Sequence, residues 1–294
     1  MRDKRGTIKR VPHDKASAFQ KQGMDFWECG KYNEDKKENR RMRSLVLCDN
    51  AEPEKVIALC RKYHLGIEIQ GFYDPNTTED AEELIAVYEG LLPKEIEKHF
   101  HAPFWDLCLG SSNRKIVEIT RYYFDYAYEI AEKLGAMSIT VHEGFIPFTS
   151  YPEGWIRRAT VFWKEFFETH PGNIQMYMEN QVETDPETLI GTVDSLENSR
   201  LGVNLDIGHA HCVSGLPVLK WIEKLEGRIR YVHLHQNYGK RDEHLGLREG
   251  NMPIREILDA LNEYSPDAIW ALEPNRPEDI EDSILFLREC GYLK

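Results

Sequence analysis

Short apolar runs alternate with longer amphipathic stretches along most of the chain, beginning near residue 44. The runs are rich in β-branched and aromatic residues, and the stretches between them repeat apolar residues at helical spacing, which predicts alternating strands and helices. Strands are expected at 44–49, 65–72, 96–103, 136–144, 174–180, 201–208, 229–237 and 268–275. The clearest helices are expected at 113–134, 154–169, 214–225 and 276–290.

The number and spacing of these strands favour a barrel. Successive strand starts lie roughly 32 residues apart on average, which is the size of one strand–helix unit. Eight such units predict a single-domain α/β fold, a (β/α)8 TIM barrel, over residues 42–294. A doubly wound parallel sheet is the structural alternative for the same units.

The first 41 residues differ from the rest of the chain. They are polar, lack sustained apolar periodicity and carry a net charge of +5, whereas the remaining residues carry −18. We therefore expect residues 1–41 to form an N-terminal extension, either a solvated tail or a docked segment, without a catalytic role. Binding to nucleic acid usually requires a basic surface, so the acidic body argues against DNA or RNA as a general partner.

Composition restricts the class of protein further. The chain has 294 residues, of which 41% are hydrophobic and 30% charged, as in ordinary globular proteins. It has no apolar run near the ~18 residues of a membrane span, so we expect no membrane partner and a cytoplasmic location. Six scattered cysteines without a C-x-x-C pair predict reduced thiols. A homo-oligomer is kept as an open alternative.

Side chains that commonly bind metals gather at the predicted strand ends and in the loops that follow them. They are His101, His142, Glu179, Asp206, His209, His233, Asp242, His244 and Glu273. The carboxyl ends of barrel strands meet at one face, where buried carboxylates without partners are costly and cations would neutralise them. Imidazole mixed with carboxylate suits Zn or Mn better than Mg or Ca. Singly, each of these residues could instead be a hydrogen-bonded or ion-paired core residue.

Three further histidines lie close to these candidates. His99 and His235 are each two residues from a proposed ligand on the same strand, which favours a core or supporting role. His211 follows His209 by two residues in a predicted loop, and for it too a ligand role and a supporting role stay open.

The segments around these residues resemble one superfamily. "FHAPFWDL", "TVHEG", "YMEN", "VNLDIGHAH", "YVHLHQN", "KRDEHLGLREGN" and "WALEPN" are similar to the xylose isomerase-like TIM barrels, which include sugar isomerases, sugar epimerases and endonuclease IV proteins. The resemblance covers residues 42–294. It implies a divalent-metal enzyme with one to three ions per chain, Zn or Mn.

The two branches of the superfamily imply different ligand sets. The sugar 3-epimerase pattern implies one ion held by Glu179, Asp206, His233 and Glu273, with His209 as an accessory histidine. The endonuclease IV pattern implies three zinc ions held by all nine candidates. The chain departs from the endonucleases at His235 and Gln236, where an Asn-Asp pair is usual, and has Arg248 in place of the first glycine of a common Gly-Glu-Gly turn.

The sequence favours isomerisation or epimerisation of a sugar or sugar phosphate. Glu179 and Glu273 would move the proton through a metal-stabilised enediolate, while His209 orients a hydroxyl. Substrate contacts are expected from Lys240 and Arg241 to a phosphate and from Trp105 to the sugar. The main alternative is a multi-zinc phosphoesterase like endonuclease IV, with a non-catalytic barrel as a third hypothesis.

Overall fold

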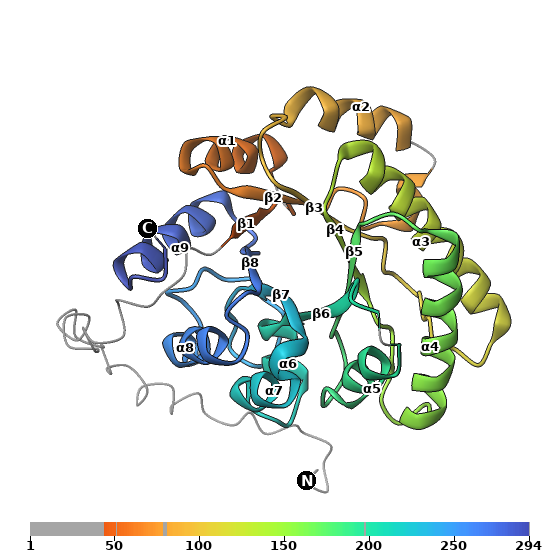
Figure 1. The fold of residues 1–294 in the computed structure, drawn as a ribbon. Helices are drawn as coiled ribbons and strands as arrows, with labels where there is room; N and C mark the ends of the chain where they lie inside the picture. Colours follow the sequence, from red (N-terminus) through yellow and green to blue (C-terminus); the bar gives the residue numbers. More distant parts are fainter. Residues whose placement is uncertain (1–43, 51, 79–80, 197, 294) are drawn as a thin grey trace, which may run out of the picture. The chain divides into compact units, whose positions relative to one another are not determined.

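The computed structural model describes residues 44–50, 52–78, 81–196 and 198–293, so the predicted extension over residues 1–41 lies outside the described residues. Eight parallel strands pair in chain order and close into a barrel, with β8 beside β1 (Figure 1). The strands are β1 (Leu45–Cys48), β2 (Gly66–Ile69), β3 (Lys98–His101), β4 (Ser138–His142), β5 (Gln175–Glu179), β6 (Leu201–Asp206), β7 (Ile229–Leu234) and β8 (Ile269–Leu272).

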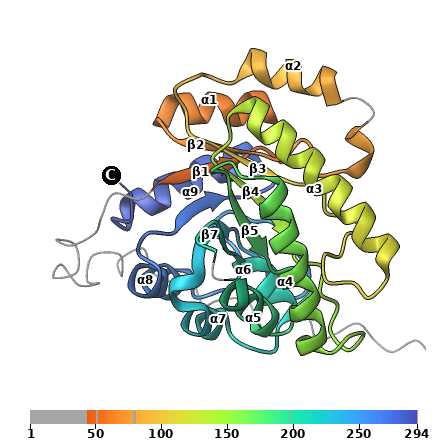
Figure 2. The ribbon, with the colours of Figure 1, turned by 45° about the vertical axis from the view of Figure 1, so that its right-hand side comes forward.

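Helices cover the outside of the barrel in both views (Figures 1 and 2). The α-helices are α1 (Pro53–Tyr63), α2 (Ala81–Leu91), α3 (Arg114–Leu134), α4 (Pro152–Thr169), α5 (Glu187–Leu196), α6 (Ile207–Val213), α7 (Val218–Leu225), α8 (Ile254–Tyr264) and α9 (Pro277–Glu289). The described residues also form two short 3₁₀ helices, η3 (Pro75–Thr78) and η4 (Glu226–Arg228). In the described part of the chain, no helix combines the length and the apolar character that crossing a membrane requires.

Two apolar clusters flank the strands. The larger cluster packs the outward side chains of the strands against the helices, and includes the fully buried Trp163 and Trp221. The smaller cluster includes Val46, Tyr177 and Tyr231 and brings side chains of several strands together. Almost all strand positions are buried, as expected for parallel β-structure that is covered on both faces.

Local sequence signals account for several helix ends. Asn113 accepts a hydrogen bond from the backbone of Lys115 and thereby caps α3, while Gly135 ends that helix at a φ of 76°. Pro152 and Pro277 begin α4 and α9, where the missing N–H of proline has no cost. These signals explain why the predicted ranges 113–134, 154–169 and 276–290 lie close to the observed helices.

The barrel predicted from the sequence is confirmed, and the main local difference occurs after β6. Strand prediction there extended to residue 208, but β6 ends at Asp206 because the Asp206 carboxylate caps α6 through the backbone N–H of His209. His209 and His211 consequently lie on a helix, and the expected loop position of His211 is wrong. The predicted helix at 214–225 is α7, which begins at Val218.

Candidate metal centre

Strand register brings the predicted ligands together at the carboxyl ends of the barrel. His142 is paired with Glu179 across β4 and β5, and Asp206 is paired with His233 across β6 and β7. Glu273 directly follows β8. The ligands on or directly after strands are buried, whereas His209 and His244 are partly exposed and Asp242 is exposed.

Most of the candidate ligands form three neighbouring groups, which we call the first, central and third groups. Within each group the potential ligand atoms lie within 4.8 Å of one another. The first group is His101, His142 and Glu179, the central group is Glu179, Asp206 and His233, and the third group is His209, Asp242 and His244. Glu273 borders the central group, with its Oε2 3.3 Å from His233 Nδ1.

The carboxylate of Glu179 joins the first group to the central group. Its Oε2 lies 3.3 Å from His101 Nε2 and 3.5 Å from His142 Nε2. Its Oε1 lies 3.3 Å from His233 Nδ1 and 3.3 Å from His209 Nδ1. The two oxygens therefore face different sets of histidines, an arrangement suited to a carboxylate that bridges two metal ions.

Backbone carbonyls orient three of the imidazoles. Nδ1 of His101, His209 and His244 donates to a carbonyl oxygen at 2.8, 2.8 and 2.9 Å, respectively. In each neutral ring the proton is thereby placed on Nδ1, which leaves the Nε2 lone pair free. Nε2 of His101 faces Glu179. Nε2 of His209 and Nε2 of His244 both face Asp242. Metal-binding histidines are commonly held by such a hydrogen bond to the other nitrogen.

The electrostatics of the centre come from paired imidazoles and carboxylates. Burial opposes ionisation of Glu179, but the charge of His233 holds its pKa well below the usual range. Burial also disfavours the imidazolium of His244, but Glu273 and Asp242 raise its pKa to about 9. His142 differs, because burial lowers its pKa to about 4 despite the opposing charge of Glu179. Histidines with a raised pKa, such as His244, therefore carry a proton whose positive charge offsets the carboxylates, as a metal ion would.

The donor set fits divalent ions such as Zn or Mn. Glu273 Oε2, which lies beside His233 of the central group, is buried without a hydrogen-bond partner. Unpartnered buried polar atoms are costly, and nitrogen mixed with carboxylate oxygen is the chemistry that these ions accept. None of the described residues that line the adjoining cavity is Lys or Arg.

A cavity of about 260 Å³ opens onto the first and third groups, and onto the central group through Glu179 and the adjoining Glu273. Besides the ligands, its walls contain aromatic rings and amides: Tyr73, Phe104, Asn50, Gln70, Gln181 and Asn275. The Phe104 ring stacks on His142 with ring centres 4.2 Å apart, so it also fixes one candidate ligand. The cavity thus combines flat apolar surfaces with polar amides beside the candidate ligands.

The three predicted substrate-binding residues lie outside the set that lines this cavity. Trp105 is half exposed and packs edge-on against Tyr73, a cavity residue, with ring centres 5.7 Å apart. Lys240 and Arg241 are exposed in the loop after β7. Contacts from these three residues to a substrate stay predictions.

The structure adds residues that the sequence analysis did not assign. Glu68 and Gln70 on and after β2, together with Cys48 of β1, lie behind His233 and Glu273. The available signal was a glutamate between two isoleucines in a fully buried strand. His235, for which the sequence predicts a core or supporting role, lies 3.2 Å from both oxygens of Asp206.

We expect the metal-free protein to lose stability as the pH rises from about 7 to about 9. The pKa of His244 is about 9, above its ordinary value of 6.5. A histidine with a raised pKa contributes stability that is complete below the unfolded pKa and disappears as the pH passes the folded pKa. Melting temperatures of chelator-treated protein should fall by several degrees over this interval.

The zinc-loaded protein provides the comparison for this experiment. A bound ion requires neutral imidazoles, so its melting temperature should be flat or should rise over the same interval. Parallel pH profiles with and without zinc would contradict these electrostatics.

Comparisons with known proteins agree with this fold. The family model described as the xylose isomerase-like TIM barrel matches residues 23–290. The chain is 31% identical to the uncharacterized protein MJ1311 of Methanocaldococcus jannaschii, over 68% of this chain and 71% of that protein. It is 24% identical to a probable endonuclease 4 of Mycobacterium ulcerans, over 75% of this chain and 86% of that protein.

A solved structure of a D-tagatose 3-epimerase-like protein superposes with a TM-score of 0.69. That protein is 26% identical, and the match covers 85% of this chain and 97% of the other. The resemblance noted in the sequence is therefore confirmed: the chain belongs to the xylose isomerase-like TIM barrel family.

Proposed function

We propose that this protein is a multi-metal hydrolase of phosphate esters. The observation that carries the proposal is the position of Glu179, whose two oxygens face two separate histidine sets. One ion for each of the three groups accounts for all nine predicted ligands when Glu273 completes the central group. Bound divalent ions would supply a hydroxide at neutral pH and positive charge beside the phosphate oxygens.

Several side chains would hold the metal groups and the bound ester in place. Glu179 holds the first and central groups at a fixed separation, because each of its oxygens is committed to one of them. Gln70 donates to Glu273 at 2.6 Å and keeps that carboxylate directed at the central group. Amide side chains such as Asn50 and Gln181 line the cavity, where they would offer hydrogen bonds to a bound ester.

Sugar isomerisation or epimerisation, favoured by the sequence, is the second candidate. Its support is the placement of Glu179 and Glu273, each 3.3 Å from His233 Nδ1, together with the D-tagatose 3-epimerase-like neighbour. Proton transfer, however, requires a carboxylate oxygen that is free to take the proton. Both oxygens of Glu179 already face histidines, and a single ion in the central group would not account for the ligands of the third group. We therefore rank hydrolysis first.

A small phosphate ester is the substrate class we propose. The cavity volume of about 260 Å³ suits a small molecule, and the acidic body of the chain opposes the approach of a polyanion. The related probable endonuclease 4 supports phosphoester chemistry but not a DNA substrate for this chain. We also keep a cytoplasmic location as a prediction.

Metal counting with two outer-ligand variants tests the proposal. The full chain should bind one ion per group, and His101→Ala or Asp242→Ala should each lose an ion and nearly all hydrolysis of small phosphate esters. His211→Ala is the matched control, because its ring contacts Asn251 and lies outside the three groups.

Other results of the same experiment would select another function. One ion per chain, retained in both variants together with epimerisation of a ketose, would favour the sugar reaction. Efficient cleavage of DNA at abasic sites would keep the hydrolase but overturn the proposed substrate class.

A further inference from the structure

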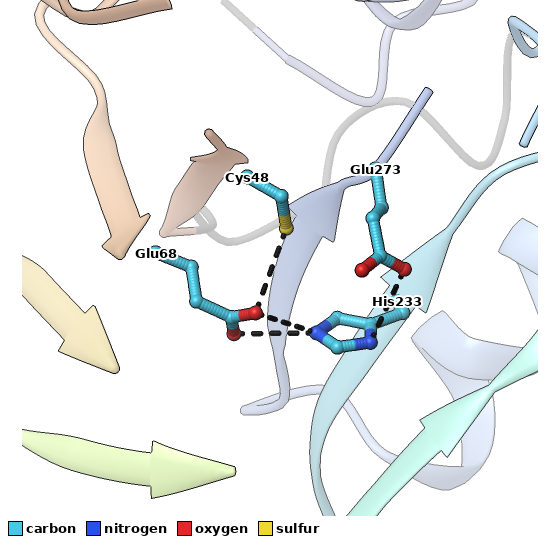
Figure 3. A group of neighbouring side chains, drawn as sticks. All are labelled: Cys48, Glu68, His233 and Glu273. Carbon is cyan, nitrogen blue, oxygen red and sulfur yellow. Dashed lines mark hydrogen bonds and ion pairs between the residues drawn. The ribbon is translucent and has the colours of Figure 1, made fainter. Parts of the chain in front are cut away.

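His233 is oriented differently from the other histidines of the centre. Its Nε2 points away from the metal groups and lies 3.0 and 3.2 Å from the two oxygens of Glu68 (Figure 3). Its Nδ1 points toward the central group, 3.3 Å from both Glu179 and Glu273. For His101, His209 and His244 the orienting acceptor is a backbone carbonyl, but here it is a carboxylate.

Glu68 is fixed in place behind the centre. It is fully buried on β2 and is not among the residues that line the cavity, so it does not reach a substrate. Gln70 Nε2 donates to Glu68 at 2.8 Å and to Glu273 at 2.6 Å. One short network therefore connects the support of His233 to a second ligand of the same group.

We propose that Glu68 is a positioning residue for the central metal group, and this inference rests on the proposed metal centre. Its carboxylate accepts a hydrogen bond from the Nε2–H of neutral His233. Nδ1 therefore carries the lone pair and would present it to the ion. A carboxylate is a stronger acceptor than a carbonyl and makes the imidazole a better donor to the metal. The site thus sets the tautomer of His233 opposite to that of His101.

A metal site deeper in the barrel is the competing explanation. Cys48, Glu68, His233 and Glu273 offer ligand atoms within 4.8 Å of one another, and Figure 3 shows Cys48 above Glu68. Existing contacts satisfy the Cys48, Glu68 and His233 atoms without an ion, since Cys48 Sγ lies 3.8 Å from Glu68 Oε1 and His233 donates to the same carboxylate. The geometry therefore favours positioning.

Two variants of Glu68 in the full chain separate positioning from packing. Glu68→Gln keeps an oxygen that accepts from His233, whereas Glu68→Leu fills the space without an acceptor. Zinc affinity measured against a competing chelator should fall about 10–100-fold for the leucine variant, with a smaller loss for glutamine. A role in packing alone predicts wild-type zinc affinity for the glutamine variant, because glutamine has nearly the same size and shape as glutamate.

Glu97→Gln is the matched control. Glu97 accepts from His99 Nε2 at 2.9 Å, so the change alters the same kind of pair away from the metal groups. Its zinc affinity and zinc count should equal those of the wild type.

Each alternative result overturns a defined claim. Wild-type zinc affinity in both Glu68 variants overturns the positioning role, and Glu68→Gln alone decides the matter if the leucine variant does not fold. Loss of an ion in Cys48→Ala assigns the cluster to a deeper metal site instead. Wild-type protein that binds no zinc removes the proposed function as well, which distinguishes that failure from the others.

Discussion

Replacing Glu179 with glutamine is expected to abolish turnover and to weaken two metal groups at once. Each oxygen of the carboxylate faces a different histidine set, and an amide offers one weak oxygen ligand and one N–H₂ donor directed at the remaining set. The side chain is buried, so solvent cannot replace the lost charge. Metal content after dialysis should fall by more than one ion per chain, and phosphoester hydrolysis should fall to background.

Glu143→Gln controls for the loss of a buried carboxylate at the same rim. Burial, together with the neighbouring Glu183, raises the pKa of Glu143 well above its usual range, so an amide resembles its neutral form. Its Oε1 accepts from Thr188, which an amide oxygen also allows. This variant should keep its ions and activity. Retention of all ions in Glu179→Gln would show that Glu179 does not bridge the groups.

The barrel could be predicted because its strands are buried on both faces. Such strands appear as short apolar runs, and they alternate with helices whose spacing and caps are visible in the chain, as for Asn113 and Gly135 of α3. Strand ends were less certain. The run that continues past Asp206 could not show that this carboxylate closes the strand by capping α6.

The proximity of the candidate ligands followed from the fold, since all eight strands end at one face. What the sequence could not provide was the direction of each donor atom. The bridging position of Glu179 depends on which histidine faces which oxygen, and the reversed ring of His233 depends on Glu68, some 165 residues away in the chain. These contacts are the reason that we rank phosphoester hydrolysis above sugar epimerisation, because both oxygens of Glu179 already face histidines.

Glu68 and Gln70 were overlooked for a related reason. Polar residues in an apolar strand are noticed as ligands only when they lie at its carboxyl end, but Glu68 lies one residue before the end of β2. Its proposed role depends on its contact with His233 of β7, on the other side of the barrel interior. A buried acidic residue between two isoleucines is nevertheless a usable signal, because such a carboxylate requires a partner.

Asp206→Asn is expected to remove the stabilisation that zinc gives to the protein. Asp206 is fully buried; its Oδ1 caps α6 at 2.7 Å, and His235 Nε2 lies 3.2 Å from both oxygens. Asparagine can still cap the helix, so α6 should persist, but the charge-assisted contacts are lost. The free energy of unfolding of metal-free protein should fall by about 1.5–3 kcal/mol.

The effect on the zinc-loaded protein should be larger. A ligand that binds only the folded state stabilises it according to its affinity, so loss of the central ion removes that contribution. Asp185→Asn is the matched control, because Asp185 accepts from the backbone of Glu187 at the start of α5, outside the three groups, and asparagine caps equally well. Thermal unfolding with and without zinc should show the wild-type shift in Asp185→Asn and a much smaller one in Asp206→Asn. An unchanged shift in Asp206→Asn would mean that the central group holds no ion.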